Sequence, residues 1–349
     1  MDIPPFMRTE TIFSLLLVIL TTACSPDFKL PAPKTGRPEL TGEAIISADG
    51  TWLPLRTWLP EGDLAAVMVA LHGFNDYSYF IHDTAIFLAE RGIAVYAYDQ
   101  RGFGAGPHRG LWPGSQALID DLKTVTGLLH DHYPDLPLYI LGESMGGAVV
   151  MAAMADADPP ETDGVILAAP AVWSRTSMTI PQRVLLWIAA HTLPWAKVSG
   201  KSLRIRASDN TKMLEQLGRD PLVIKKTRID TIYGLTNLMD DAYNAAGHIA
   251  VPALFLYGEK DEVIPRKPVL QTFNRCANAG YAGQRFIIYK NGYHMLLRDL
   301  QADIVRKDIL AWLDKSPLPL PLPLPSTVGN QAVELSGKIW EGWHEISIR

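Results

Sequence analysis

Residues Leu136–Asp156 read LPLYILGESMGGAVVMAAMAD, an apolar strand followed almost at once by a helix rich in Ala, Val and Met. The turn between them is Gly142-Glu143-Ser144-Met145-Gly146-Gly147. A serine on so sharp a strand-to-helix turn has a strained backbone and an exposed hydroxyl. Its neighbours two places before and after must be tiny so that strand and helix can approach. The stretch therefore predicts an α/β fold in which Gly142 and Gly146 shape the turn and Ser144 is a nucleophile.

Outward from this turn, the chain alternates strands and helices, as in a mostly parallel sheet covered on both faces. We predict eight strands, at Glu43–Ala48, Trp52–Leu59, Ala65–Leu71, Ile93–Asp99, Leu136–Gly142, Gly164–Ala169, Ala253–Gly258 and Arg285–Lys290. We predict helices at Tyr79–Arg91, Ser115–His132, Met145–Asp156, Arg266–Ala279 and Asp299–Leu313. The alternation lapses between Ala169 and Ala253, where a Trp- and Met-rich stretch predicts a helical cap over the carboxyl edge of the sheet.

The composition excludes several classes of protein. The chain has 349 residues, 48% of them hydrophobic, and a net charge of -5, with 32 basic and 37 acidic residues. These values are typical of a globular protein and leave no positive excess for binding a nucleic-acid backbone. The two cysteines cannot build a disulfide framework, and no Cys/His spacing resembles a zinc site.

The N-terminus resembles a bacterial lipoprotein signal peptide. The uncharged run Thr11–Ala23 suits a signal-peptide core but is shorter than the about 20 residues of a spanning helix. It ends at Cys24, which would carry the lipid of a mature lipoprotein. This resemblance implies a membrane-anchored protein of the bacterial cell envelope, facing the periplasm. The alternative is a secreted protein with an incidental cysteine. If Cys24 is lipidated, Cys276 is left as a buried thiol.

These features divide the chain into five parts. Pro-rich residues after Cys24 predict a tether, and the alternation of Pro and Leu at Ser316–Pro325 predicts an extended linker. The predicted order is signal peptide 1–23, tether 24–40, α/β core 41–170 and 248–315, helical cap 171–247, and linker with tail 316–349.

A serine nucleophile needs a base, and the base needs a carboxylate that orients it. The predicted strand Ala253–Gly258 is followed by Glu259, Asp261 and Glu262, and loops at strand ends point toward the active site of such a fold. We predict Asp261 as the orienting acid and treat its two neighbours as solvated loop charges.

The predicted base is His294, which follows the last predicted strand in Asn291-Gly292-Tyr293-His294. A histidine on this loop would meet both Ser144 and Asp261. The other histidine after Asp261 is His344, which lies far out in the tail.

An oxyanion formed during acyl transfer needs two backbone donors. One is the N–H of Met145, directly after the nucleophile. The other is predicted at Phe74, in the loop His72-Gly73-Phe74-Asn75 after the strand Ala65–Leu71. Gly73 lets this loop bend.

At these residues the chain resembles the monoacylglycerol lipase and lysophospholipase branch of the α/β-hydrolases, within the serine aminopeptidase-like hydrolases. The matching motifs are His72-Gly73 with Ser78, Asp99-Gln100-Arg101-Gly102-Phe103-Gly104, the serine turn, and Gly218-Arg219-Asp220-Pro221 in the cap. The resemblance covers about Glu43 to Leu313 and implies a triad of Ser144, Asp261 and His294. One departure is Glu143, which stands where these lipases usually carry His.

The resulting hypothesis is a serine carboxyl-ester hydrolase that cleaves single-chain lipids, monoacylglycerols or lysophospholipids, through an acyl-enzyme and without a metal or cofactor. The partners implied are the lipid or ester substrate and a membrane, with no nucleic acid.

An amidase of the aminopeptidase kind, or a thioesterase, is the alternative on the same fold. An aminopeptidase would need an acidic pocket, which Glu143, Asp240 and Asp241 could supply. A third alternative is a binding or scaffold protein without catalysis, but such proteins usually lose a member of the triad.

Overall fold

The computed structural model describes residues 25–200 and 205–314 together with the backbone of residues 332–335. The predicted signal peptide, Cys24 and most of the predicted linker and tail lie outside the described residues. Within the described part, the order of the ten-stranded sheet is β1-β2-β3-β5-β4-β6-β7-β10-β11-β12. Its strands are β1 (Glu39–Leu40), β2 (Ala44–Ile46), β3 (Trp52–Trp58), β4 (Ala66–Leu71), β5 (Ile93–Tyr98), β6 (Leu138–Glu143), β7 (Gly164–Ala168), β10 (Ala253–Gly258), β11 (Gln284–Tyr289) and β12 (Ala332–Leu335).

The sheet is parallel from β5 to β11 and antiparallel at its two edges. All eight predicted strands are present, so the predicted α/β class with a mostly parallel sheet is confirmed. Two short strands extend the predicted sheet. The two-residue β1 pairs with β2, and β12 pairs with β11.

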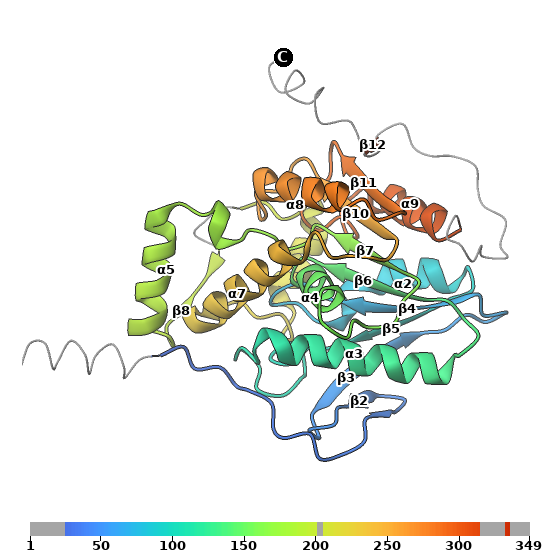
Figure 1. Ribbon diagram of the computed structural model, residues 1–349, viewed down its shortest axis with the longest axis horizontal. Coiled ribbons are helices and arrows are strands. Elements are labelled where there is room, and N and C mark those ends of the chain that lie inside the picture. The colour runs from blue at the N-terminus through green and yellow to red at the C-terminus, as the bar shows by residue number, and fades with distance from the viewer. Residues whose placement is uncertain (1–24, 201–204, 315–331, 336–349) are drawn as a thin grey trace, which may run out of the picture.

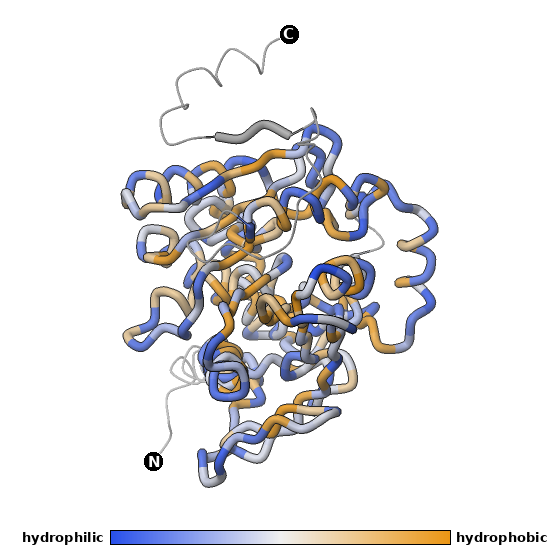
Figure 2. Tube along the Cα trace, turned by 90° about the vertical axis from the view of Figure 1, so that its right-hand side faces the viewer, coloured by the Kyte–Doolittle hydropathy of each residue, from blue (hydrophilic) through white to orange (hydrophobic). Residues whose placement is uncertain are grey.

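Helices cover both faces of the sheet (Figure 1). The first face packs against α3 (Ser115–His132), α4 (Met145–Met154) and α8 (Arg266–Ala279). The second packs against α2 (His82–Ala89), which follows a 3₁₀ turn at Ser78–Ile81, and α9 (Ala302–Asp314). Because side chains alternate along a strand, β4 sends Val67, Val69 and Leu71 to the first core and Ala66, Met68 and Ala70 to the second. The tube in Figure 2 shows hydrophobic segments running through the interior of the molecule.

The segment between β7 and β10 contains helices that differ in how closely they pack on the core. It comprises α5 (Ile180–Thr192), α6 (Thr211–Arg219) and α7 (Ile229–Ala245), with the short antiparallel strands β8 (Lys197–Val198) and β9 (Thr227–Arg228). Helix α7 packs on α3 and α4, and a Cβ at its Gly234 would lie 2.3 Å from the ring of Trp112. Helix α5 contacts α7 but stands away from the sheet (Figure 1).

Arg101 joins three parts of the fold. It follows β5, donates to Asp121 on α3 at 2.6 and 2.7 Å, and donates to Asp49 in the loop between β2 and β3 at 3.0 Å. Burial alone would raise the pKa of Asp49, but hydrogen bonds from Arg101 and Thr51 lower it to about 2. The guanidinium therefore neutralises two buried carboxylates and ties the antiparallel edge of the sheet to α3.

Arg101→Met should destabilise the fold by about 3–5 kcal/mol, because it leaves Asp49 and Asp121 buried without a counter-charge. Urea unfolding followed by tryptophan fluorescence would measure the loss. The matched control is Lys34→Met, which breaks the surface pair with Asp120, where the lysine side chain is 64% exposed. That change should cost less than about 1 kcal/mol. Equal effects of the two substitutions would contradict this role for Arg101.

Candidate active site

Ser144 sits on the turn from β6 to α4 in a conformation that few residues adopt, with φ 55° and ψ −114°. The flanking glycines permit this turn. A Cβ at Gly142 would lie 2.5 Å from the carbonyl oxygen of Gly146, and a Cβ at Gly146 would lie 2.2 Å from that of Leu71. Both distances are shorter than real contacts, so any larger residue would push the helix away from the strands.

Hydrogen bonds to neighbouring strand ends hold the strained residue. The N–H of Ser144 donates to the carbonyl of Ala168 at 2.9 Å. Its own carbonyl accepts from Ala148 at 3.0 Å and from Ala171 at 2.9 Å. The unusual backbone is thus fixed from β7 and α4 at once, as expected of strain stored at a functional site.

The three residues predicted as a triad meet in space. Ser144 Oγ lies 2.9 Å from His294 Nε2, and His294 Nδ1 lies 2.8 Å from Asp261 Oδ2. All three side chains are largely buried, with residue exposures of 6–9%. With Nδ1–H donating to Asp261, Nε2 is left to accept the serine proton, which is the arrangement that nucleophilic catalysis requires.

The second carboxylate oxygen of Asp261 orients the group. Oδ1 accepts from the backbone N–H groups of Val263 and Ile264 at 2.8 and 2.9 Å. The two acidic neighbours have other partners, because Glu262 accepts from the N–H of Arg206 and Glu259 faces Arg266. Of the three acidic residues in this loop, Asp261 is the one bonded to His294.

The loop of His294 is held from its far side by Asp299. One oxygen of Asp299 accepts from the N–H of Tyr293 at 2.7 Å, and the other accepts from Ser208 Oγ at 2.6 Å. Burial raises the pKa of Asp299 to about 6, despite these two hydrogen bonds. The contact also ties the histidine loop to the chain that leads into α6.

The loop predicted to complete the oxyanion hole lies against Ser144. A Cβ at Gly73 would stand 3.3 Å from Ser144 Cβ, so the backbone of residue 73 touches the serine. Within the described part of the chain, the N–H groups of Phe74 and Met145 have no acceptor. Two free donors beside a nucleophile suit an oxyanion site.

His72 braces this loop, a role that the sequence did not reveal. Its ring Nδ1 lies 2.8 Å from the carbonyl of Gly73, while Nε2 accepts from the N–H of Gln100 at 3.0 Å. The side chain of Gln100 returns a bond to the carbonyl of His72 at 2.9 Å. Burial lowers the pKa of His72, which keeps the ring neutral and suited to this pair of bonds.

A buried ion cluster lies behind the serine turn and was also missed. Arg298 Nη2 is 2.7 Å from Asp76 and 2.9 Å from Glu143. Burial and the Asp76 charge raise the pKa of Glu143, against the opposing effect of Arg298. The departure at Glu143 was noted in the sequence, but nothing local indicated its partner 155 residues away.

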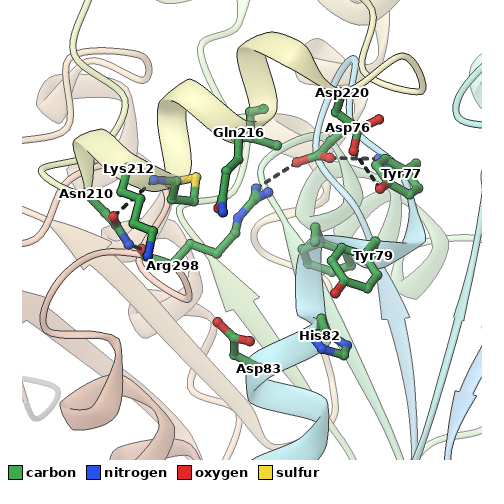
Figure 3. Close-up of a pocket in the computed structure, with 13 residues that line it drawn as sticks. Asp76, Tyr77, Tyr79, His82, Asp83, Asn210, Lys212, Gln216, Asp220 and Arg298 are labelled. Atoms are coloured by element: carbon green, nitrogen blue, oxygen red, sulfur yellow. Dashed lines mark hydrogen bonds and ion pairs between the residues drawn. The ribbon is translucent and has the colours of Figure 1, made fainter.

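Arg298 and Asp76 also border a cavity of about 660 Å³ between the loop after β4, α2 and α6 (Figure 3). The triad residues are not among those that line it. Its walls are aromatic and charged, with Tyr77, Tyr79 and His82 on one side and Lys212 and Gln216 on α6 opposite.

The three carboxylates considered for an aminopeptidase pocket do not come together. Glu143 pairs with Arg298, and Asp240 accepts from the side chain and backbone of Arg175. Asp241 lines a separate cavity between α3 and α7. Within the described residues, no cluster of three His, Cys, Asp or Glu side chains is arranged to hold a metal. The thiol of Cys276 is buried, and burial raises its pKa to about 12.

The family described as "Serine aminopeptidase, S33" matches residues 62–301 of the chain. A monoacylglycerol lipase of Mycolicibacterium smegmatis is 26% identical over 77% of this chain and 95% of its own. Human monoglyceride lipase is 25% identical over 73% of this chain and 84% of its own. A phospholipase of Bacillus subtilis is 26% identical, covering 74% of this chain and 98% of its own.

Solved structures show the same fold. A monoglyceride lipase of Saccharomyces cerevisiae superposes with a TM-score of 0.67 and 20% identity, over 82% of this chain and 99% of its own. A monoacylglycerol lipase of Paleococcus ferrophilus gives a TM-score of 0.63 at 20% identity, over 74% of this chain and 97% of its own.

The pH dependence of ester cleavage should report His294. Burial disfavours the imidazolium, but the charge of Asp261 and its hydrogen bond outweigh burial and raise the pKa of His294 above 6.5. Because the base must be neutral, kcat/KM should fall as the pH drops through a midpoint above 6.5. Glu259→Gln, on the same loop but bonded elsewhere, should leave this midpoint unchanged. A wild-type midpoint below 6.5 would contradict the assignment of His294 as a base paired with Asp261.

Proposed function

The chain belongs to the "Serine aminopeptidase, S33" family of α/β-hydrolases and is a carboxylic ester hydrolase that acts on lipid esters, and we propose that its substrates are single-chain lipids, monoacylglycerols or lysophospholipids. The single observation that carries the proposed mechanism is the hydrogen-bonded chain from Ser144 through His294 to Asp261, with two free amides beside it.

In the proposed reaction, Ser144 Oγ attacks the ester carbonyl while His294 Nε2 takes its proton. The N–H groups of Phe74 and Met145 receive the negative charge of the tetrahedral intermediate. His294 then gives its proton to the departing alcohol, which leaves an acyl group on Ser144. Water, activated by the same imidazole, releases the fatty acid, and Asp261 stabilises the imidazolium in both halves.

The choice of substrate rests on the relatives and on the charges near the serine. Three of the matched relatives are named as a monoacylglycerol lipase, a monoglyceride lipase and a phospholipase, which are names of lipid ester hydrolases. A peptidase that binds a substrate ammonium needs an uncompensated carboxylate. Glu143 and Asp240 are both paired with arginine, and Asp241 lines a separate cavity, which argues against a pocket for the ammonium of an amino-terminal peptide.

We further propose that the enzyme works at a membrane, held in the bacterial cell envelope through a lipid on Cys24. The support within the structure is α5, whose large apolar side chains face solvent; Ile180 and Leu185 are 72% and 70% exposed. Residues 164–208, which contain α5, include no Asp or Glu but six basic residues, at Arg175, Arg183, Lys197, Lys201, Arg204 and Arg206. An apolar helix with basic surroundings is the chemistry of an anionic lipid surface. Among the described residues, no helix is long and apolar enough to cross a membrane.

The first test is hydrolysis of p-nitrophenyl esters from acetate to palmitate by the chain without residues 1–24, beside Ser144→Ala. Medium and long esters should be cleaved, and the variant should lose about a thousandfold or more in kcat. Monoacylglycerol and lysophospholipid should then be compared directly. Cleavage of acetate alone would contradict the lipid substrate. Cleavage of aminoacyl amides in preference to esters would favour the amidase alternative.

The membrane proposal is tested by sedimentation with vesicles that contain anionic phospholipid, again without residues 1–24. Leu185→Asp should weaken binding, because it places a charge on the apolar face of α5. Leu59→Asp is the matched control, since Leu59 is 55% exposed but follows β3 and not the cap. Equal binding by both variants would contradict docking through α5.

Mass spectrometry of the mature N-terminus tests the proposed lipid anchor, and an unmodified Cys24 would contradict it.

A further inference from the structure

Arg298 occupies a position that connects three segments of the site: the serine turn, the proposed oxyanion loop and the histidine loop. It stands four residues after His294 in the sequence. Its Nη2 donates to Glu143, the residue before Ser144, at 2.9 Å, and contacts Asp76 at 2.7 Å. Asp76 lies two residues after Phe74, whose amide is a proposed oxyanion donor. Figure 3 shows the guanidinium pointing to Asp76 across the wall of the cavity.

The cluster is about as deeply buried as the Arg101 cluster, but its hydrogen bonding is less complete. The exposed fraction is 2% for Glu143 and 6% for Asp76, and 10% for the side chain of Arg298. Glu143 Oε1 and Arg298 Nε have no hydrogen-bond partner within the described residues. Apolar side chains at such positions often give equal or greater stability. A buried group with incomplete bonding therefore points to a role other than stability.

The cluster also acts electrostatically on the base. The charged groups around His294 come from four segments: Asp261 after β10, Glu143 at the end of β6, Arg298 and Asp299 on the histidine loop, and Asp76 behind Glu143. The Glu143 carboxylate favours the imidazolium, whereas the Arg298 guanidinium disfavours it. The two charges therefore have opposite effects on the pKa of His294.

We propose that Glu143, Arg298 and Asp76 form a positioning clamp, in which one guanidinium sets the distance between the serine turn and the oxyanion loop and offsets the charge of Glu143 at His294. This inference rests on the proposed function of the triad. Within the described residues, none of the three side chains makes a hydrogen bond to the side chain of Ser144, His294 or Asp261. They act through Ser144, the Phe74 amide and His294.

Substitutions can distinguish two effects of the clamp, one of its charges on His294 and one of its geometry on the loops. Without the Glu143 carboxylate, His294 loses a charge that favours its protonated form, so its pKa falls. Without the Arg298 guanidinium, the opposite change follows. A lysine at 298 keeps the charge, but its ammonium on a flexible stem lacks the fixed donor directions of the planar guanidinium, so it loosens the geometry without altering the charge.

The experiment is the pH dependence of kcat/KM for Glu143→Gln, Arg298→Lys and the double variant Glu143→Gln with Arg298→Gln. Glu143→Gln should move the acidic midpoint down by on the order of half a pH unit or more. The double variant should move it back up. Arg298→Lys should keep the wild-type midpoint but lose about tenfold or more in kcat with little change in KM. Asp83→Asn, a carboxylate in the same cavity without contact to Arg298, should match wild type.

The charge role would be overturned if the midpoint of Glu143→Gln stayed at the wild-type value. It would also be overturned if the midpoint of the double variant moved further down. A loss in Arg298→Lys confined to KM would overturn the geometric role. Circular dichroism and thermal unfolding identify a variant that fails to fold, and Glu143→Gln, which keeps the side chain's size, then carries the test.

Labelling of Ser144 by a fluorophosphonate distinguishes the clamp from the proposed substrate. Its rate reports activation of the serine without any lipid. If wild type reacts with the probe but cleaves no lipid ester, the substrate proposal fails, and the same midpoint shifts in labelling rate would still support the clamp. If labelling is insensitive to all three variants, the clamp fails whatever the substrate.

Discussion

The arrangement of the site depends on one close approach between backbones, where the serine turn meets the end of β4. The backbone of Gly146 passes so near the carbonyl of Leu71 that a Cβ would stand 2.2 Å from it. Leu71 leads directly into His72 and Gly73, so this contact also brings the proposed oxyanion loop to the serine. Ser144 and one of the two proposed amide donors are therefore placed by the same backbone packing of a strand end on a turn.

Buried charge is arranged in the same way at two places in the fold. Arg101 lies between Asp49 and Asp121, and Arg298 lies between Asp76 and Glu143. In each case one planar guanidinium bridges carboxylates from distant segments, which a compact ammonium does less well. The first joins the antiparallel edge of the sheet to α3. The second joins the segments that carry Ser144, the proposed oxyanion donor Phe74 and His294. Asp261 differs from these carboxylates because two backbone amides and the imidazole, not an arginine, complete its bonding.

The sequence predicted those features that have a local pattern. The eight strands appear in place, and α3 and α8 have the predicted bounds. The glycine spacing indicated the serine turn, and the loops after two strands indicated Asp261 and His294, which the structure brings together. The Arg298 cluster could not be predicted, because its members are separated by 67 and 155 residues and follow no periodicity. The brace at His72 was missed for the same reason, since Gln100 lies 28 residues away. The edge strand β1 is too short to leave a hydrophobic pattern.

The segment between β7 and β10 shows why apolar content alone does not identify a helix's role. Helices α5 and α7 are both rich in apolar residues, yet α7 packs on α3 and α4, and its Gly234 fits against Trp112. Helix α5 has one fully buried residue, Ala190, and leaves its large side chains exposed. Such exposure is costly in water unless another apolar surface covers it. An absence of acidic residues over 164–208 removes the charges that would repel an anionic lipid surface. The same segment thus combines a helix that completes the core beside the serine with a helix whose exposed apolar face fits the lipid surface proposed above.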